Sequence, residues 1–263
     1  MKTLKTSWAV TLILVLLTPL LYAQESETQL LMVHEENVIV SEFDNYWKSQ
    51  EHFNQVLADH NITDIEFYTH STNDNRFWFV VPIENYAALD KDLFQSLGNA
   101  LGEEGMKALF DEFAGTFTGQ RDYVIRYHPD LSYKADELGS ENNNFRVWWF
   151  GYIHMGKSDE YIEVQKEWKT LYEKTNAKQG YTVYTGGVGM DVPVIAVMFW
   201  AESPAAFAAL AEETIQMQGE EREALWNKSK ALLRKMERVE GWYHPQLSYV
   251  PETPEEAAES SNE

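Results

Sequence analysis

A seven-residue stretch that occurs twice decides the fold: Tyr127-His128-Pro129-Asp130-Leu131-Ser132-Tyr133 and Tyr243-His244-Pro245-Gln246-Leu247-Ser248-Tyr249. Six of the seven positions are identical, and the two copies lie 116 residues apart. The pair Tyr68-Thr69 recurs at the same spacing as Tyr184-Thr185. Separated matches at one spacing indicate that the chain contains an internal duplication.

The two copies share one expected order of elements. A strand opens each copy (30–34 and 147–154), a helix follows (41–59 and 158–175), and two strands come next (65–70 with 77–81, and 181–185 with 194–200). A second helix begins near Asn85 and near Pro204 and breaks near Gly102 and Gly219, and a last strand spans 122–128 and 239–244. Ser41 and Ser158 are expected to cap the first helix of each copy. The order β-α-β-β-α-β is the split βαβ, or ferredoxin-like, motif.

Both faces of the expected strands are apolar, as in Phe77-Trp78-Phe79-Val80-Val81 and Val147-Trp148-Trp149-Phe150. Strands that are buried on one face alternate between apolar and polar residues, whereas strands buried on two faces do not. Helices cover one face of a ferredoxin-like sheet, so the other face needs a second cover. The other copy's sheet is the expected cover, which predicts an α+β fold in which two tandem ferredoxin-like repeats pack sheet to sheet as a pseudo-dimeric α/β barrel.

This pattern resembles the dimeric α/β-barrel superfamily, in which two ferredoxin-like units pack in this way. The superfamily includes antibiotic-biosynthesis-type monooxygenases, stress-induced small barrels and chlorite-dismutase-like haem proteins. The resemblance is one of topology and duplication, and the chain has no family catalytic motif. The expected organisation is a signal peptide (1–23), repeat one (24–134), a polar linker (135–144), repeat two (145–250) and an acidic disordered tail (251–263).

The first 23 residues are typical of a secretory signal. Lys2 and Lys5 precede an apolar run from Trp8 to Leu17, and Ala23 is a suitable residue before a cleavage point. The alternative is an uncleaved anchor, but the run is shorter than the roughly 20 apolar residues that span a bilayer. We therefore expect a periplasmic or secreted protein that has no membrane association after the signal is removed.

Charge and cysteine content exclude several classes of partner and chemistry. The net charge of −21 becomes −23 without residues 1–23, which contain two lysines and no acid. Such a surface repels nucleic acid and anionic lipid. The chain has no cysteine, so disulfides and thiol catalysis are excluded. No Gly-x-Ser-x-Gly sequence or phosphate-binding glycine loop is present.

Strand parity predicts which side chains lie between the two sheets. In 147–154 the even-numbered residues carry the polar groups, and the 116-residue spacing transfers this parity to 32 and 34 in the first copy. A cavity lined by aromatic side chains is predicted. Its candidate ligand-binding residues are His34, Glu66, Tyr68, His70, Arg126, Trp148, Tyr152, His154, Tyr184 and Trp242. The alternative is a filled interface in which these polar groups pair with one another.

Three functions are compatible with these residues. The leading hypothesis is an exported protein that binds a small, largely apolar or aromatic molecule between its sheets. The second is an enzyme, either monooxygenase-like or haem-dependent, and the resemblance then implies an axial histidine among His34, His70 and His154. The third is a non-catalytic scaffold with a filled barrel. The repeated Tyr-His-Pro-x-Leu-Ser-Tyr stretch is interpreted as a structural lock, because a proline ends strand pairing and the serine can cap a turn.

The signal hypothesis predicts the mass of the exported protein. Cleavage after Ala23 gives a mature chain that begins at Gln24. Intact-mass spectrometry of protein recovered from outside the cytoplasm measures this directly. A recovered chain that still carries residues 1–23 would show an anchor instead.

Overall fold

The computed structural model describes residues 28–139 and 142–251. The expected signal peptide and nearly all of the expected tail lie outside these residues. The first half contains β1 (Gln29–Val38), α1 (Phe43–Asp59), β2 (Tyr68–Thr72), β3 (Arg76–Ile83), α2 (Gln95–Asp111) and β4 (Phe117–Tyr127). The second half contains β5 (Phe145–Ile153), α3 (Ser158–Thr175), β6 (Tyr181–Gly186), β7 (Val194–Ala201), α4 (Pro204–Ala231) and β8 (Leu233–Tyr243). Within the described ranges, no helix has the length and apolar character needed to cross a membrane.

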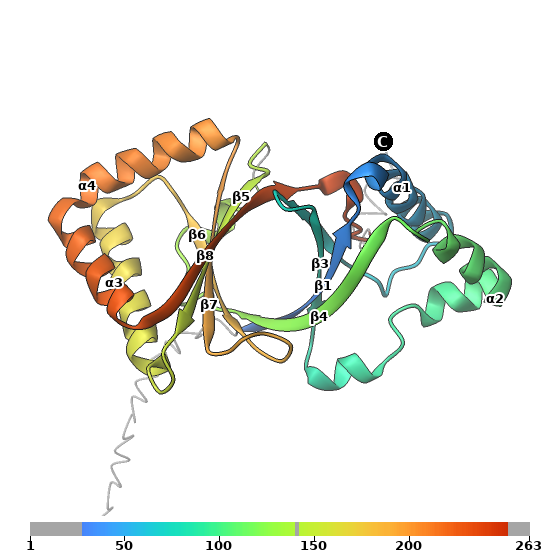
Figure 1. Ribbon diagram of the computed structural model, residues 1–263, viewed down its shortest axis with the longest axis horizontal. Coiled ribbons are helices and arrows are strands. Elements are labelled where there is room, and N and C mark those ends of the chain that lie inside the picture. Colours follow the sequence, from blue (N-terminus) through green and yellow to red (C-terminus); the bar gives the residue numbers. More distant parts are fainter. Residues whose placement is uncertain (1–27, 140–141, 252–263) are drawn as a thin grey trace, which may run out of the picture.

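The eight strands form one closed antiparallel barrel in the order β1-β3-β2-β8-β5-β7-β6-β4. The two halves meet at two seams, where β2 pairs with β8 and β4 pairs with β6. Helices α1 and α2 cover one side of the barrel, and α3 and α4 cover the opposite side (Figure 1). The chain is therefore α+β with a closed barrel, and both faces of the strands are covered as their composition predicts.

The expected order of elements agrees with the structure, but two details differ. Glu42 and Lys157 precede α1 and α3, and neither Ser41 nor Ser158 caps a helix. A short 3₁₀ turn (Val40–Glu42) occupies the place where Ser41 was expected to act. The serine that does cap a helix is Ser203, whose Oγ accepts a hydrogen bond from the Ala206 backbone amide at 3.2 Å. The second helix of each half breaks at the glycine that predicted the break, Gly102 in α2 and Gly219 in α4.

The loop between β6 and β7 lies against β4. The Val124 amide donates to the Val188 carbonyl and the Gly187 amide donates to the Val124 carbonyl, both at 2.8 Å. A Cβ atom on Gly189, which has φ +87°, would lie 2.5 Å from the carbonyl oxygen of Asp122. Glycine thus permits the close approach that extends this seam, and the loop is part of the barrel wall.

The repeated stretches, here called the first exit segment (127–133) and the second exit segment (243–249), each cross to the other half. The first follows β4 and runs beside β6, where Tyr133 and Tyr181 exchange backbone hydrogen bonds at 2.9 Å. The Ser132 Oγ donates to the His128 carbonyl at 2.7 Å and accepts from the Val183 amide at 3.0 Å. Leu131 is buried among aromatic side chains of the second half.

The second exit segment makes the reciprocal contacts in the first half. Tyr249 pairs with Phe67 through backbone bonds of 2.8 and 2.9 Å. The Ser248 Oγ donates to the His244 carbonyl at 2.8 Å and accepts from the Thr69 amide at 2.9 Å. The His244 ring packs edge-on against Trp47 of α1 with centroids 5.0 Å apart. The repeated stretch is therefore a lock, and it joins the two halves.

Each exit serine should contribute to the stability of the whole barrel. Ser132→Ala and Ser248→Ala each leave a strand amide of the opposite half without its acceptor, which costs about 1–3 kcal/mol of unfolding free energy. Denaturant unfolding measures this loss. The matched control is Ser158→Ala, because Ser158 makes no capping bond. Equal stability of all three variants would show that the seams do not depend on these hydroxyls.

The second exit segment should also make stability depend on pH. Burial lowers the pKa of His244 from 6.5 to about 4, so the folded protein favours the neutral ring. The unfolded chain therefore binds more protons between these values. The resulting stabilisation is complete above about pH 6.5 and is lost as pH falls toward 4.

Thermal melts at steps from pH 7 to pH 4.5 test this expectation. His244 Nε2 lies 2.7 Å from Ser71 Oγ. The melting temperature of the wild type should fall more steeply than that of His244→Gln, whose amide can bond Ser71 but does not titrate. His154→Gln, a change at an exposed position, should follow the wild type. Parallel curves for wild type and His244→Gln would contradict the assignment.

Candidate functional site

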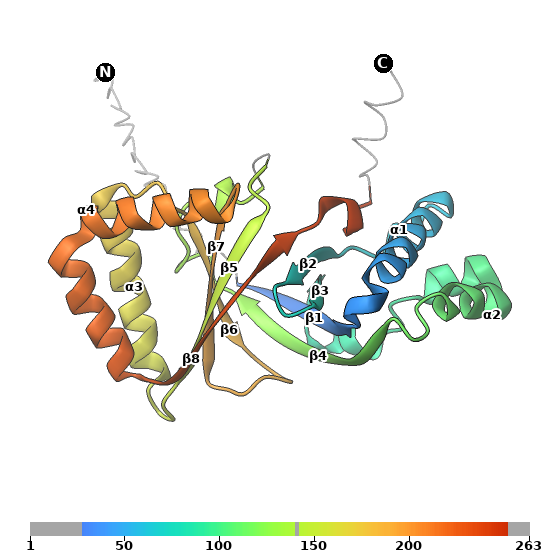
Figure 2. The same ribbon diagram turned by 45° about the horizontal axis from the view of Figure 1, so that its top comes forward.

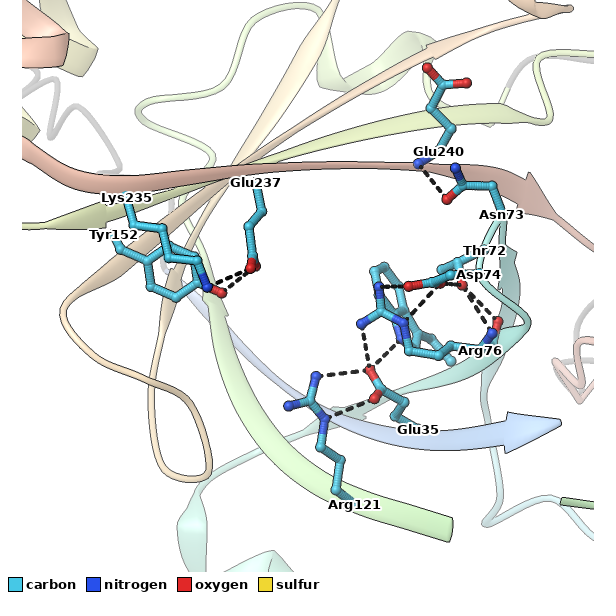
Figure 3. Close-up of polar contacts among 11 residues, drawn as sticks. Glu35, Thr72, Asn73, Asp74, Arg76, Arg121, Tyr152, Lys235, Glu237 and Glu240 are labelled. Carbon is cyan, nitrogen blue, oxygen red and sulfur yellow. Dashed lines mark hydrogen bonds and ion pairs between the residues drawn. The ribbon is translucent and has the colours of Figure 1, made fainter. Parts of the chain in front are cut away.

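A group of polar side chains lies inside the barrel, and we call it the charged layer: Glu35, Arg76, Arg121, Tyr152 and Glu237. Glu35 of β1, which is 3% exposed, accepts hydrogen bonds from Trp78 Nε1 at 2.6 Å and from Arg121 Nε at 2.8 Å. Arg76 Nη1 lies 3.3 Å from the same carboxylate (Figure 3). Nearby, the Tyr152 hydroxyl donates to Glu237 at 2.7 Å. These donors satisfy the buried carboxylate and join β1 to β3 and β4.

The rest of the interior contains a cavity of about 520 Å³, here called the barrel cavity. Five of the residues predicted from sequence line it: Glu66, Tyr68, His70, Trp148 and Tyr184. Sequence analysis missed Arg146, Tyr127 and Tyr243, which line it as well. Arg146 belongs to the even-numbered set of β5, so that parity could have identified it. The barrel is therefore partly hollow.

Five predicted residues lie outside the barrel cavity. Tyr152 points inward but belongs to the charged layer. Arg126 faces outward, because the odd-numbered residues of β4 line the cavity, and its Nη1 donates to Thr28 Oγ1 at 2.9 Å. Trp242 is 39% exposed and packs on Phe145 with centroids 5.2 Å apart. His154 follows β5 and is exposed.

His34 is the fifth misplaced residue, and the cause is a change of register. The inward residues are even-numbered in β5 but odd-numbered in β1, so the 116-residue spacing fails for the opening strands. His34 faces the helices, with Nδ1 2.7 Å from Asp122 Oδ1 and Nε2 3.3 Å from Glu36 Oε1. Burial opposes protonation of this ring, but the bonds and charges of Glu36 and Asp122 outweigh it and raise the pKa of His34.

Two tyrosines of the barrel cavity occupy equivalent strand positions but have different surroundings. The Tyr68 hydroxyl donates to Glu66 Oε1 at 2.7 Å, and burial together with this carboxylate raises its pKa. Tyr184 lies against Tyr127 with ring centroids 5.5 Å apart. Burial raises the pKa of Tyr184 to about 12. Both hydroxyls are therefore protonated donors at neutral pH.

His70 lies among aromatic rings of this cavity. Its ring meets Trp148 at 5.6 Å and Tyr243 at 5.3 Å between centroids. Its buried Nδ1 has no hydrogen-bond partner among the described residues. Burial, followed by the charge of Arg146, lowers the pKa of His70 well below 6.5. The ring is neutral at physiological pH and offers one nitrogen to the cavity.

A second cavity of about 600 Å³ lies between the sheet and helices α3 and α4, and we call it the helix–sheet cavity. Figure 2 shows the two helices side by side on the outer face of the second half's strands. Many of the residues that line it are aromatic: Trp149, Tyr161, Trp168, Tyr172, Tyr181, Phe199, Phe207 and Trp226. The sequence placed the predicted cavity between the two sheets, so this second cavity was not predicted.

Two buried polar groups without protein partners belong to the helix–sheet cavity. Gln179 Nε2 and the Tyr181 hydroxyl are buried and make no hydrogen bond within the described part of the chain. Residues two apart in an extended segment project to the same side, so both groups face one wall. Burial strongly raises the pKa of Tyr181, so its hydroxyl remains protonated. The wall therefore presents two donors that require acceptors.

Comparison with known proteins identifies the fold. No protein-family model and no curated protein sequence matches this chain. An anthrone oxidase-like protein of known structure is similar with a TM-score of 0.55 and 13% identity, over 84% of this chain and 93% of that one. A Fusobacterium nucleatum protein named as a monooxygenase gives 0.54 and 12%, over 83% and 93%.

A haem-binding protein from Thermus thermophilus is more distant, with a TM-score of 0.47 and 10% identity over 84% of this chain and 94% of that one. It carries no weight for the function of this chain. At these identities the two closer structures show the fold alone. The chain resembles the dimeric α/β barrels, with both halves of the barrel supplied by one chain.

The haem that was considered from the sequence would need an axial ligand among the described residues. An axial ligand is usually histidine, cysteine, methionine or tyrosine. His34 is paired with acids outside the barrel and His154 is exposed, so His70 is the one candidate left from sequence analysis. Aromatic rings enclose His70, and no histidine lines the helix–sheet cavity. Among the described residues, no three histidine or acidic side chains are grouped as metal ligands.

Proposed function

We propose that this protein binds a small molecule with an aromatic, largely apolar body, and that the helix–sheet cavity is its principal site. The observation that carries the proposal is the pair of buried donors, Gln179 Nε2 and the Tyr181 hydroxyl, on an otherwise aromatic wall. A buried donor without an acceptor costs about 1–3 kcal/mol. A ligand that places an acceptor oxygen at this wall removes that cost.

The chemistry of the cavity defines the ligand class. Ligand sites are typically about 300–1,000 Å³ with apolar walls and a few oriented polar groups, and 600 Å³ lies within this range. Two neutral donors side by side favour a carbonyl or phenolic oxygen. The indole and phenol rings favour a flat partner. A planar aromatic ketone or quinone meets all three conditions.

This proposal departs in one respect from the expectation based on sequence, which placed the ligand between the two sheets. The hollow space in each cavity argues against the filled scaffold. We further propose that the two halves are tandem ferredoxin-like repeats, because each has the same order of elements and neighbouring strands. We also propose that the protein is periplasmic or secreted, on the evidence of residues 1–23.

The alternative function is oxidation of the bound aromatic molecule. Two structures of similar fold are named as an anthrone oxidase-like protein and a monooxygenase. These names favour the oxidation alternative. Within the described lining of the helix–sheet cavity, the one carboxylate belongs to Glu223, which is exposed at the edge. Binding is therefore the better-supported function. Oxygen consumption with anthrone as substrate distinguishes the alternatives.

Filling the helix–sheet cavity should weaken binding. Ala211 of α4 lines the cavity, whereas Ala209 of the same helix is exposed. We expect 1,8-dihydroxyanthraquinone to quench the tryptophan fluorescence of the wild type saturably, because three tryptophans line the site. Ala211→Trp should weaken this binding about five- to 160-fold, since overpacking costs about 1–3 kcal/mol.

Two further variants serve as controls. Ala209→Trp adds the same side chain outside the cavity and should bind like the wild type. Tyr181→Phe should weaken binding while leaving the melting temperature of the free protein unchanged or higher, because it removes a buried hydroxyl that makes no described hydrogen bond. Equal affinities for Ala211→Trp and Ala209→Trp would place the ligand elsewhere.

A further inference from the structure

Arg146 of β5 is a buried cation without a buried anion. The residue is 3% exposed and lines the barrel cavity. Its Nη1 donates to the backbone carbonyls of Asn143 and Phe145, and its guanidinium lies 5.5 Å from the centroid of the Tyr243 ring. Its Nε has no partner, and no aspartate or glutamate in the described ranges forms an ion pair with it. Most of its charge is therefore uncompensated.

The charged layer of the same barrel shows how this protein satisfies other inward-facing arginines. Arg76 and Arg121 both bind Glu35 at distances of 3.3 Å or less. Removing one member of a buried pair is costly because it leaves an unpaired charge. Arg146 is likewise a buried charge without an opposite charge beside it. Burial lowers its pKa to about 10, so the guanidinium is still protonated at neutral pH.

The barrel cavity has one acidic side chain in its described lining, Glu66, and another group already binds it. The Tyr68 hydroxyl donates to Glu66 at 2.7 Å, and no ion pair joins Glu66 to Arg146. His70 and Tyr184, whose charges act on Arg146 or feel it, are neutral at physiological pH, and the guanidinium also lies against the Tyr243 ring. The cavity therefore attracts a single negative charge at Arg146, while Glu66 disfavours a second.

We propose that the barrel cavity is a separate binding site for a small organic carboxylate, whose charged group pairs with the free Nε edge of Arg146. A guanidinium edge and a carboxylate match in a two-bond geometry. Trp78, Trp148, Phe150 and Met198 supply apolar walls for the rest of the molecule. The free Nδ1 of His70 can bond a hydroxyl or carbonyl substituent. This inference does not depend on a ligand in the helix–sheet cavity.

Matched acids and amides test the proposal. Benzoate, phenylacetate and octanoate are compared with benzamide, phenylacetamide and octanamide in thermal-shift titrations of the full chain. The acids should raise the melting temperature of the wild type and the amides should not. Arg146→Met should weaken acid binding by about ten- to a hundredfold, because a hydrogen bond to a charged group contributes about 1.5–3 kcal/mol.

The melting temperature of Arg146→Met without added ligand distinguishes a binding role of Arg146 from a structural one. Arg146→Met should melt at the same temperature as the wild type or higher, since it removes an unpaired buried charge. Arg126→Met, which removes an outward-facing arginine from β4, should retain acid binding. Ala211→Trp should retain it too, so failure of the helix–sheet site would not affect this result.

Three outcomes would overturn the proposal. The first is an equal effect of acids and amides on the wild type. The second is undiminished acid binding by Arg146→Met. The third is Glu66→Gln lowering stability without strengthening acid binding, which would identify Glu66 as the internal counter-ion of Arg146.

Discussion

The structure depends on the reciprocal crossing of the two exit segments. Each seam of the barrel is short: β2 and β8 pair over three residues, and so do β4 and β6. The exit segments lengthen both seams by continuing the backbone pairing beyond the strand ends. Without them, each half would present an unpaired strand edge and an aromatic sheet face to water. The cavity between the sheets exists because both seams are closed in this way.

The two halves share one order of elements but differ in the side chains that line the cavities. Tyr68 and Tyr184 are equivalent, as are Tyr127 and Tyr243, and all four line the barrel cavity. By contrast, the position equivalent to His70 is Gly186. The space between helices and sheet also differs, because the first half fills it with Tyr46, Phe53, Leu57, Phe77 and Leu97. The second half leaves the helix–sheet cavity there.

Much of the fold was predictable because it depends on local and repeated signals. The exit segments, the two-faced apolar strands and the helix-breaking glycines were enough for the order of elements and the closed barrel. Five cavity residues, including Tyr68 and Trp148, followed from strand parity. His34 was misplaced because one residue of difference in register reverses every side chain of a strand. The helix–sheet cavity depends on how α4 packs, which tertiary contacts determine and no single segment encodes.

Arg146 bonds two backbone carbonyls and packs on the Tyr243 ring, but these contacts do not neutralise its charge. The opening strand of the first half lines the same cavity with Gln29, Leu31 and Val33. An uncharged strand can therefore form this part of the barrel wall. A net charge of −21 repels small anions at long range, but solvent ions screen that field over about 8 Å. Inside the cavity the nearest charge dominates, and its strength grows as water is excluded. An acidic protein can thus hold an organic anion at one buried guanidinium, and the repulsion outside it would limit binding to molecules whose apolar body also fits the walls.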